Sequence, residues 1–270
     1  MKISYLLYSI LLPVAGLVSC DNLDLDERLD GPIQTIASKN VLIEDFTGQK
    51  CSNCPLAHEE VEKLQKVYGA DKVIAVAIHG GPQAVDDSNT SIVGLANEQG
   101  REYNRRWGSF SYPKGVVDRQ GGLTDFEKWN ASVAVRSTIH PKVNLQIDKA
   151  EVDASTRQLE LECSVEALDA VDGRLQLWLT ESDIVALQTM PGVWGGGISK
   201  DYVHHHVFRT SINGLDGESL ALGKDDKVEK KYIYTISEKW QAKHMSLIMI
   251  YYSDDHGVMQ VIDIKLNDNN

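Results

Sequence analysis

The stretch Val41–Pro55, VLIEDFTGQKCSNCP, is the segment of the chain most informative about its fold. It opens with the apolar run Val41–Phe46, which predicts a buried strand, and it ends in a CxxC motif. The next segment, Leu56–Tyr68, places its apolar residues on one helical face, and Lys72–His79 predicts a second buried strand. A CxxC between a strand and a helix is typical of a dithiol redox site.

The position of the two cysteines in the motif suggests different roles for them. The unsatisfied N–H groups and the dipole at a helix start stabilise a thiolate on the first cysteine. We therefore expect Cys51 to be the attacking thiol and Cys54 the resolving thiol. A purely structural disulfide and half of a zinc site remain as alternatives. Zinc needs two further ligands, and this region offers only the scattered His58, His79 and His140.

Two further features resemble the thioredoxin superfamily. Asp45 lies six residues before Cys51, and the pair Tyr112–Pro113 precedes a short apolar strand. The resemblance implies that Asp45 assists proton transfer and that Pro113, in a cis bond, shapes the substrate groove. The motif lacks the tryptophan and the Gly-Pro pair of thioredoxin, so the redox potential of thioredoxin does not carry over. Helices are expected at Ser91–Arg106 and at Thr124–Ser137.

The N-terminus predicts export and lipid attachment. Residues 1–19 combine Lys2 with an apolar run that is shorter than the ~20 residues of a membrane-spanning helix, as in a signal peptide. The segment Leu17–Cys20 resembles a bacterial lipobox, which implies lipid at Cys20. Residues 20–39 then form an acidic tether, either a flexible linker or a signal for surface export. We expect a lipid-anchored outer membrane protein that faces the periplasm or the cell surface.

Composition limits the function and suggests two domains. The 270 residues carry a formal net charge of -12, which argues against nucleic acid as a partner. The length allows two domains of ordinary size, and the hydrophobic period changes near His140–Pro141. We therefore predict an α/β thioredoxin-like domain over residues 40–139 and an all-β domain over residues 140–270.

Alternating apolar residues predict the second domain as an antiparallel sandwich of immunoglobulin-like type. About seven strands are expected, with turns at Asp172–Gly173 and Asn213–Gly214. Cys163 falls on an inward face and is expected to be a small buried hydrophobe. The predicted strands are Val143–Ile147, Leu159–Val165, Leu175–Leu179, Val203–Arg209, Lys231–Ile236, Leu247–Tyr252 and Val258–Ile264.

Two other features of the second half invite functional readings. The run His204–His206 places His204 and His206 on one face of an expected strand, a spacing that can chelate a metal. No carboxylate or cysteine is obviously paired with them, so we predict a structural role and no metal. Trp194, in a glycine-rich loop, is a candidate contact residue. No cofactor is expected.

The whole chain resembles one family, the outer-membrane-protein-28-related lipoproteins of Gram-negative anaerobes. The resemblance runs from Cys20 to Ile264 and is specific for location and architecture, not for activity. The segments that carry it are Asp45–Gly48, Cys51–Pro55, Tyr112–Pro113, Leu179–Val185 and Tyr202–Arg209.

We predict thiol–disulfide exchange on exported proteins as the function. The alternative is a surface binding or adhesion lipoprotein with an unidentified partner, in which the thioredoxin fold is a scaffold. The exposure of Cys51 discriminates between the two, because an exchanging thiol must reach solvent.

Overall fold

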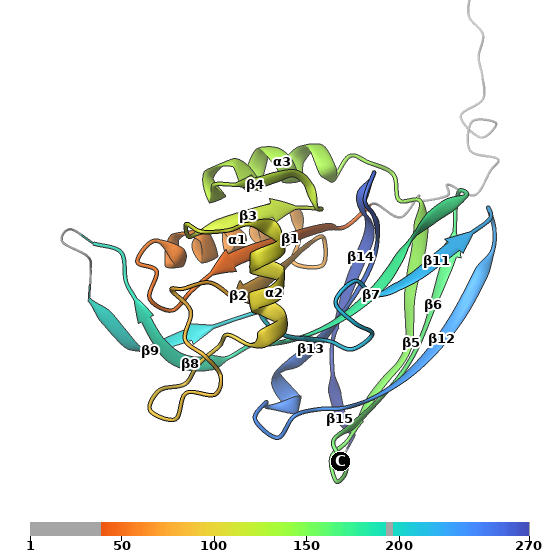
Figure 1. Cartoon of the computed structure of the whole chain (residues 1–270). Helices are drawn as coiled ribbons and strands as arrows, with labels where there is room; N and C mark the ends of the chain where they lie inside the picture. Colours follow the sequence, from red (N-terminus) through yellow and green to blue (C-terminus); the bar gives the residue numbers. More distant parts are fainter. Residues whose placement is uncertain (1–38, 193–196, 270) are drawn as a thin grey trace, which may run out of the picture. The chain divides into compact units, whose positions relative to one another are not determined.

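The structure, a computed structural model, describes residues 39–192 and 197–269. Its largest part is a nine-stranded sheet with the order β14-β13-β7-β10-β2-β1-β3-β4, and β11 pairs with β7 (Figure 1). The strands of this sheet are β1 (Val41–Thr47), β2 (Val73–His79), β3 (Lys114–Val117), β4 (Gln120–Thr124), β7 (Val171–Glu181), β10 (Val207–Ser211), β11 (Glu218–Leu222), β13 (Met245–Ser253) and β14 (Gly257–Lys265).

Helices cover both faces of the first part of this sheet. The two predicted strands and the helix between them are present: β1 and β2 are parallel and are joined by α1 (Cys54–Tyr68). Because successive side chains of a strand point to opposite faces, Val41 and Ile43 pack toward α1 and α3 (Trp129–Arg136). Leu42 and Phe46 pack on the other face, in the core that includes Tyr103 of α2 (Glu98–Trp107).

The large sheet continues across the predicted domain boundary. Strand β10 pairs in parallel with β2, with Val207 opposite Ala77, and β7 pairs antiparallel with β10. On the face of the sheet that α2 covers, the rings of Tyr103, Trp178 and Phe208 contact one another at centroid distances of 5.1–5.3 Å. Strands from both sides of residue 140 thus share one sheet and one core. The prediction of two domains with separate sheets, divided at residue 140, is therefore wrong.

A sandwich nevertheless forms in the second half. A four-stranded sheet, of order β12-β6-β5-β15, encloses an apolar core together with β7 and β13. Cys163 lies buried in this core, as predicted. The predicted turn at Asp172–Gly173 is instead part of β7, where Gly173 allows close approach of Tyr251. The strands of the smaller sheet are β5 (Val143–Asp153), β6 (Gln158–Ala167), β12 (Lys227–Thr235) and β15 (Asn267–Asn269).

A separate two-stranded hairpin is formed by β8 (Ile184–Thr189) and β9 (Ile198–His204). The sequence predicted one strand over Val203–Arg209, but β9 ends at His204 and β10 starts only at Val207. The reason is that His206 adopts a left-handed φ of 55°, which breaks the strand. His204 and His206 therefore do not lie on one strand face.

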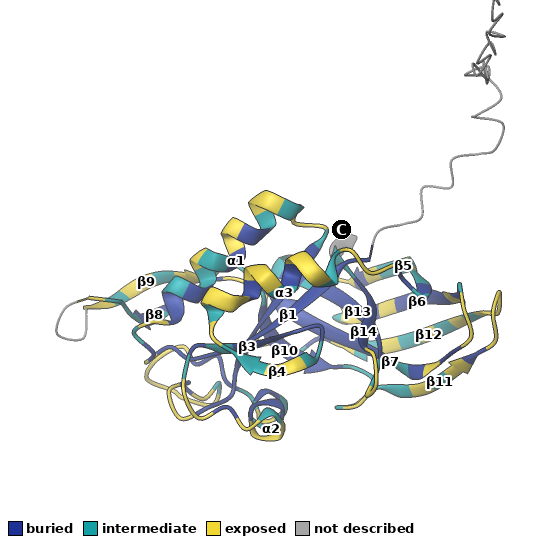
Figure 2. Cartoon of the chain, turned by 90° about the horizontal axis from the view of Figure 1, so that it is seen from above, coloured by how far each residue is buried: buried dark blue, intermediate teal, exposed yellow. Residues whose placement is uncertain are grey.

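The two other predicted helices are shorter than expected. The helix predicted over Ser91–Arg106 begins only at Glu98, because the Asn97 side chain caps it by accepting a hydrogen bond from Gly100 N at 2.8 Å. The helix predicted over Thr124–Ser137 is α3, preceded by the 3₁₀ turn η1 (Phe126–Lys128). A second 3₁₀ turn, η2 (Ala242–His244), precedes β13. Burial is greatest along the central strands of the large sheet (Figure 2).

Candidate functional site

The CxxC motif lies at the start of α1 and is oxidised. Cys51 and Cys54 form a disulfide, with their Cα atoms 5.5 Å apart. Cys54 is the first residue of the helix, and Pro55 follows it at a position where a missing N–H is tolerated. The disulfide therefore sits beside the N–H groups of the first helical turn, the environment that favours a thiolate once the bond is reduced.

The proline loop lies beside the motif. The Tyr112–Pro113 bond is cis, as the resemblance implied. Strand β3 follows this bond and pairs antiparallel with β1, which places Gly115 opposite Asp45. A cavity of about 500 Å³ is lined by Asn53 of the CxxC motif, by the proline loop and by η1. The CxxC loop and the cis-proline loop thus form two walls of one groove.

The disulfide itself is covered. Cys51 is only 1% exposed, and Cys54 is completely buried. Strand β8 is attached to the loop that carries the disulfide: the Gln188 side chain donates a hydrogen bond to the Cys51 carbonyl oxygen at 2.8 Å. Next to it, the Thr189 N–H donates to the Gln49 carbonyl oxygen at 2.8 Å. Sequence reasoning missed Gln188, because no local pattern connects a strand residue to a loop 137 positions earlier.

Asp45 is buried on the face of the sheet that α1 covers. It is 2% exposed, and its Oδ1 has no hydrogen-bond partner among the described residues. Burial raises the pKa of this carboxyl group to about 8. His58, one turn into α1 from Cys54, brings its Nε2 to 3.5 Å from Asp45 Oδ2. The His58 Nδ1 atom lies 2.9 Å from the hydroxyl oxygen of Tyr202 in β9.

Three histidines from different elements meet beside Asp45. His58 comes from α1, His79 ends β2 and His204 ends β9. The His204 ring lies 5.6 Å from that of His79 and 6.5 Å from that of His58, measured between centroids. Both ring nitrogens of His79 and of His204 are buried without a hydrogen-bond partner in the described part of the chain. We call His58, His79 and His204 the histidine cluster.

Burial keeps the histidine cluster uncharged. Desolvation lowers the pKa of His204 to about 4 and that of His79 well below its usual value. The pKa of His58 is also lowered, first by burial and then by the neighbouring His204. At neutral pH the three rings are therefore neutral imidazoles. The sequence singled out His204 but did not bring it together with His58 and His79.

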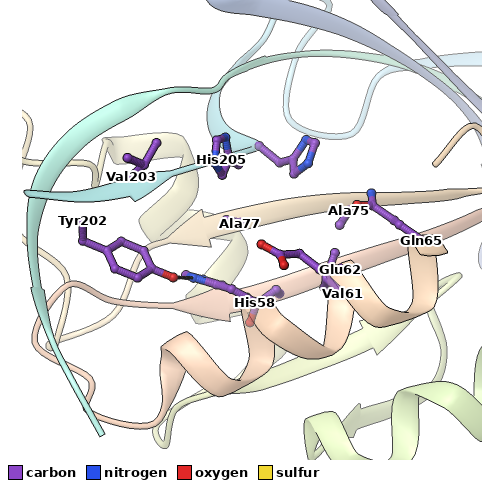
Figure 3. Close-up of a pocket in the computed structure, with 11 residues that line it drawn as sticks. His58, Val61, Glu62, Gln65, Ala75, Ala77, Tyr202, Val203 and His205 are labelled. Atoms are coloured by element: carbon purple, nitrogen blue, oxygen red, sulfur yellow. Dashed lines mark hydrogen bonds and ion pairs between the residues drawn. The ribbon is translucent and has the colours of Figure 1, made fainter.

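A cavity of about 380 Å³ opens next to Asp45 and His58 (Figure 3). Its walls come from α1, β2 and β9, and His205 and His206 close one side. The figure shows Tyr202 reaching from β9 to His58, while Glu62 projects from α1 into the same space. Among the described residues that line it there is no lysine or arginine.

Two predicted site residues cannot be placed. Cys20, the predicted lipid attachment site, and Trp194, the predicted contact residue, lie outside the described residues. Of the remaining predicted residues, the structure brings Cys51, Cys54, Asp45 and Pro113 to the same end of the large sheet. Among the helices of the described residues, none is long and apolar enough to cross a membrane.

The fold and the site define a class: a β-rich protein with a CxxC disulfide at a helix start, beside a cis-proline loop. Residues 100–270 match the family described as outer membrane protein Omp28. Since this is more than half of the chain, the chain belongs to the Omp28 family, and its predicted outer-membrane location is confirmed. The match begins after the CxxC motif and so carries no information on the disulfide.

Among solved structures, one with a TM-score above 0.5 gives a likeness in fold. HBP35 of Porphyromonas gingivalis superposes with a TM-score of 0.60 at 15% sequence identity, covering 85% of this chain and 76% of that one. A domain of the outer membrane lipoprotein Omp28 from the same organism gives 0.33 at 19% identity, covering 48% of this chain and 99% of that one. None of the curated proteins compared with the chain matches it.

Proposed function

We propose that the chain is a lipoprotein, anchored through Cys20, that exchanges thiols and disulfides with exported proteins by means of Cys51 and Cys54. One observation carries the proposal: the disulfide begins a helix and stands beside a groove whose other wall is the cis-Pro113 loop. The order of β2, β1, β3 and β4, with α1 and α3 on one face, supports a thioredoxin-like arrangement for this part of the chain.

The exchange proceeds through a mixed disulfide. In the reduced protein, the Cys51 thiolate attacks a disulfide of the substrate, and one substrate sulfur leaves as a thiolate. Cys54 then attacks Cys51, which restores the Cys51–Cys54 disulfide and releases the second substrate thiolate. Two electrons pass from the protein dithiol to the substrate disulfide. The same steps in reverse oxidise a substrate dithiol. Asp45 remains the residue predicted to assist proton transfer.

The groove reaches the CxxC motif at Asn53, although neither cysteine lines it. Asn53, between the two cysteines, lines the groove together with Ser111 and Tyr112. Nearby Phe110 is 86% exposed, which provides an apolar contact for an extended peptide. Because Cys51 is buried and Gln188 of β8 is hydrogen-bonded to its carbonyl oxygen, we further propose that the β8–β9 hairpin moves away from the CxxC loop before exchange.

The cover on Cys51 favours a second candidate. A disulfide at 1% exposure suits a structural staple in a binding or adhesion lipoprotein, with contacts made elsewhere on the surface. The two functions differ in whether a substrate ever reaches the Cys51 sulfur atom. They are therefore separable by a single activity measurement.

Reduction of insulin disulfides by the full chain in detergent, with dithiothreitol as the electron source, tests the proposal. Exchange predicts a rate well above that of dithiothreitol alone and its loss in Cys51→Ser. The matched control is Cys163→Ser, which removes a buried thiol of the sandwich core and should keep the rate. A rate equal to that of dithiothreitol alone would reject exchange and favour a structural disulfide in a binding or adhesion lipoprotein.

A further inference from the structure

The cavity of about 380 Å³ beside α1 has in its wall a carboxyl group that is poorly satisfied by the protein. Asp45 lines this cavity and is 2% exposed, and its Oδ1 has no hydrogen-bond partner among the described residues. Its Oδ2 lies 3.5 Å from His58 Nε2, which is too long for a charge-assisted hydrogen bond. Because a buried carboxyl group without hydrogen bonds is costly, a donor on a bound ligand would lower that cost.

The charges around the cavity favour a positively charged ligand. Glu62 projects from α1 into the cavity, and among the described lining residues there is no lysine or arginine (Figure 3). Burial raises the pKa of Tyr202 to about 12, and the neighbouring carboxylates of Glu62 and Glu59 raise it further. The potential at the Tyr202 hydroxyl is therefore negative, as expected where a cation would bind.

Two of the histidines in the lining do not oppose a cation. Burial lowers the pKa of His58 to about 3 and that of His206 to about 4, so both rings are uncharged at neutral pH. Their rings present aromatic surface without positive charge. Together with Asp45 and Glu62, they give the cavity an acidic and aromatic polar side.

The rest of the lining suits an organic molecule. A small-molecule pocket typically measures about 300–1,000 Å³ and combines apolar walls with a few polar groups. The ring of Tyr202 stands on the β9 side, with its centroid 6.0 Å from that of His58, and aromatic rings attract organic cations. Four further side chains provide the apolar walls, namely Val61, Ala75, Ala77 and Val203.

We propose that this cavity binds a small organic amine in its ammonium form, with Asp45 as the hydrogen-bond acceptor and Glu62 as a second negative charge. The hydrocarbon part of the amine lies against the apolar walls and the ring of Tyr202. Neither cysteine of the CxxC motif lines the cavity, so the site is separate from the disulfide and does not depend on the proposed exchange.

Binding of the ammonium group is coupled to the ionisation of Asp45. Burial raises the pKa of this carboxyl group to about 8, so it is mostly protonated at pH 7. An ammonium ion favours the carboxylate, so its binding lowers this pKa and releases a proton. The affinity should therefore rise about eightfold between pH 7 and pH 8.5, the ratio of the ionised fractions at the two pH values.

The neighbours of Asp45 leave this pH dependence intact. The lowered pKa values of His58, His79, His204 and His206 keep these rings uncharged over the range, and Tyr202 stays protonated. The other two groups are Glu62 and His205, whose Nδ1 lies 3.4 Å from Asp183 Oδ1. The variant His205→Gln should therefore keep the rise in affinity with pH.

Isothermal titration of the full oxidised chain in detergent with phenethylamine tests the proposal. The matched probes are 2-phenylethanol and 3-phenylpropanoate, which carry the same ring with a neutral and with an anionic group. One phenethylammonium ion is expected to bind per chain, at least tenfold more tightly than either matched probe. Absence of binding by phenethylamine, or equal binding by all three compounds, would overturn the proposal.

Variants locate the amine. At pH 8.5, Asp45→Asn should weaken phenethylamine binding more than tenfold and remove the rise in affinity with pH, and Glu62→Gln should weaken binding about fivefold. Glu60→Gln, on the same helix but outside the lining, is the matched control and should bind as the unaltered chain does. Equal binding by Glu62→Gln and Glu60→Gln, or loss of the pH dependence in His205→Gln, would contradict the assignment. Because Glu62 is exposed, Glu62→Gln decides even if Asp45→Asn fails to fold.

Discussion

The two halves of the molecule bury different kinds of side chain. The core of the sandwich is apolar, and Leu177, Leu247 and Met249 are completely buried in it. Beside α1, by contrast, Asp45 and His79 are nearly as deeply buried, with polar atoms that lack partners among the described residues. The sandwich core therefore stabilises the fold, whereas the face beneath α1 buries polar groups at a cost in stability. Departures of this kind from well-satisfied packing are expected at functional sites.

The largest expected effect tests this contrast directly. Leu177→Ala leaves a cavity in the sandwich core and should lower the free energy of unfolding by about 3 kcal/mol. His79→Leu removes a buried imidazole whose ring nitrogens have no hydrogen-bond partner among the described residues, and it should leave that free energy unchanged or raise it by about 1 kcal/mol. Urea denaturation followed by circular dichroism measures both.

Ile233→Ala, on an exposed side chain, is the control for the first variant and should cost less than about 0.5 kcal/mol. If His79→Leu destabilised the chain as much as Leu177→Ala, the buried polar side chains beside α1 would stabilise the fold as much as the apolar core of the sandwich does.

A smaller effect is expected on the rate at which the Cys51–Cys54 disulfide is reduced, and it tests whether β8 limits access to the disulfide. Gln188→Ala removes the hydrogen bond to the Cys51 carbonyl oxygen. Loss of about 1 kcal/mol in closing β8 over the loop should speed reduction of the disulfide by a soluble phosphine about fivefold. Gln146→Ala, on an exposed strand position, is the control. Equal reduction rates in both variants would show that β8 does not limit access.

The smallest effect is expected at Cys163. Burial raises the pKa of its thiol to about 12, so the thiolate is scarce through pH 9. Iodoacetamide should leave Cys163 unmodified in the folded protein across pH 7–9 and modify it after unfolding in urea. Rapid labelling of the native protein would contradict an inert core position.

The local features of the fold were predictable from the sequence, and the long-range ones were not. The strand before Cys51, the helix after it and the cis bond at Pro113 depend on neighbouring residues, and the structure has all three. The pairing of Val207 with Ala77 joins segments 130 residues apart, and no periodicity encodes it. Domain separation at residue 140 was predicted from a change in period, which does not reveal that β7 and β10 extend the first sheet.

The candidate site also contains some residues that were predictable from the sequence and others that were not. Asp45 and the two cysteines were found from their spacing in one short segment. His58, His79 and Tyr202 are ordinary residues of a helix and two strands, and only the packing of β9 near α1 brings Tyr202 to His58. Gln188 was missed for the same reason.

Exchange at Cys51 passes through a mixed disulfide with the substrate, and trapping that species tests the proposed function. In cells that express Cys54→Ser, the attacking thiol remains and the resolving thiol is absent, so exported partners should accumulate as dithiothreitol-sensitive adducts of the chain. Cys51→Ser should trap few or none, and Cys51→Ser combined with Cys54→Ser should trap none. Adduct yields that are equally low in all three variants would contradict exchange and indicate that the disulfide is purely structural.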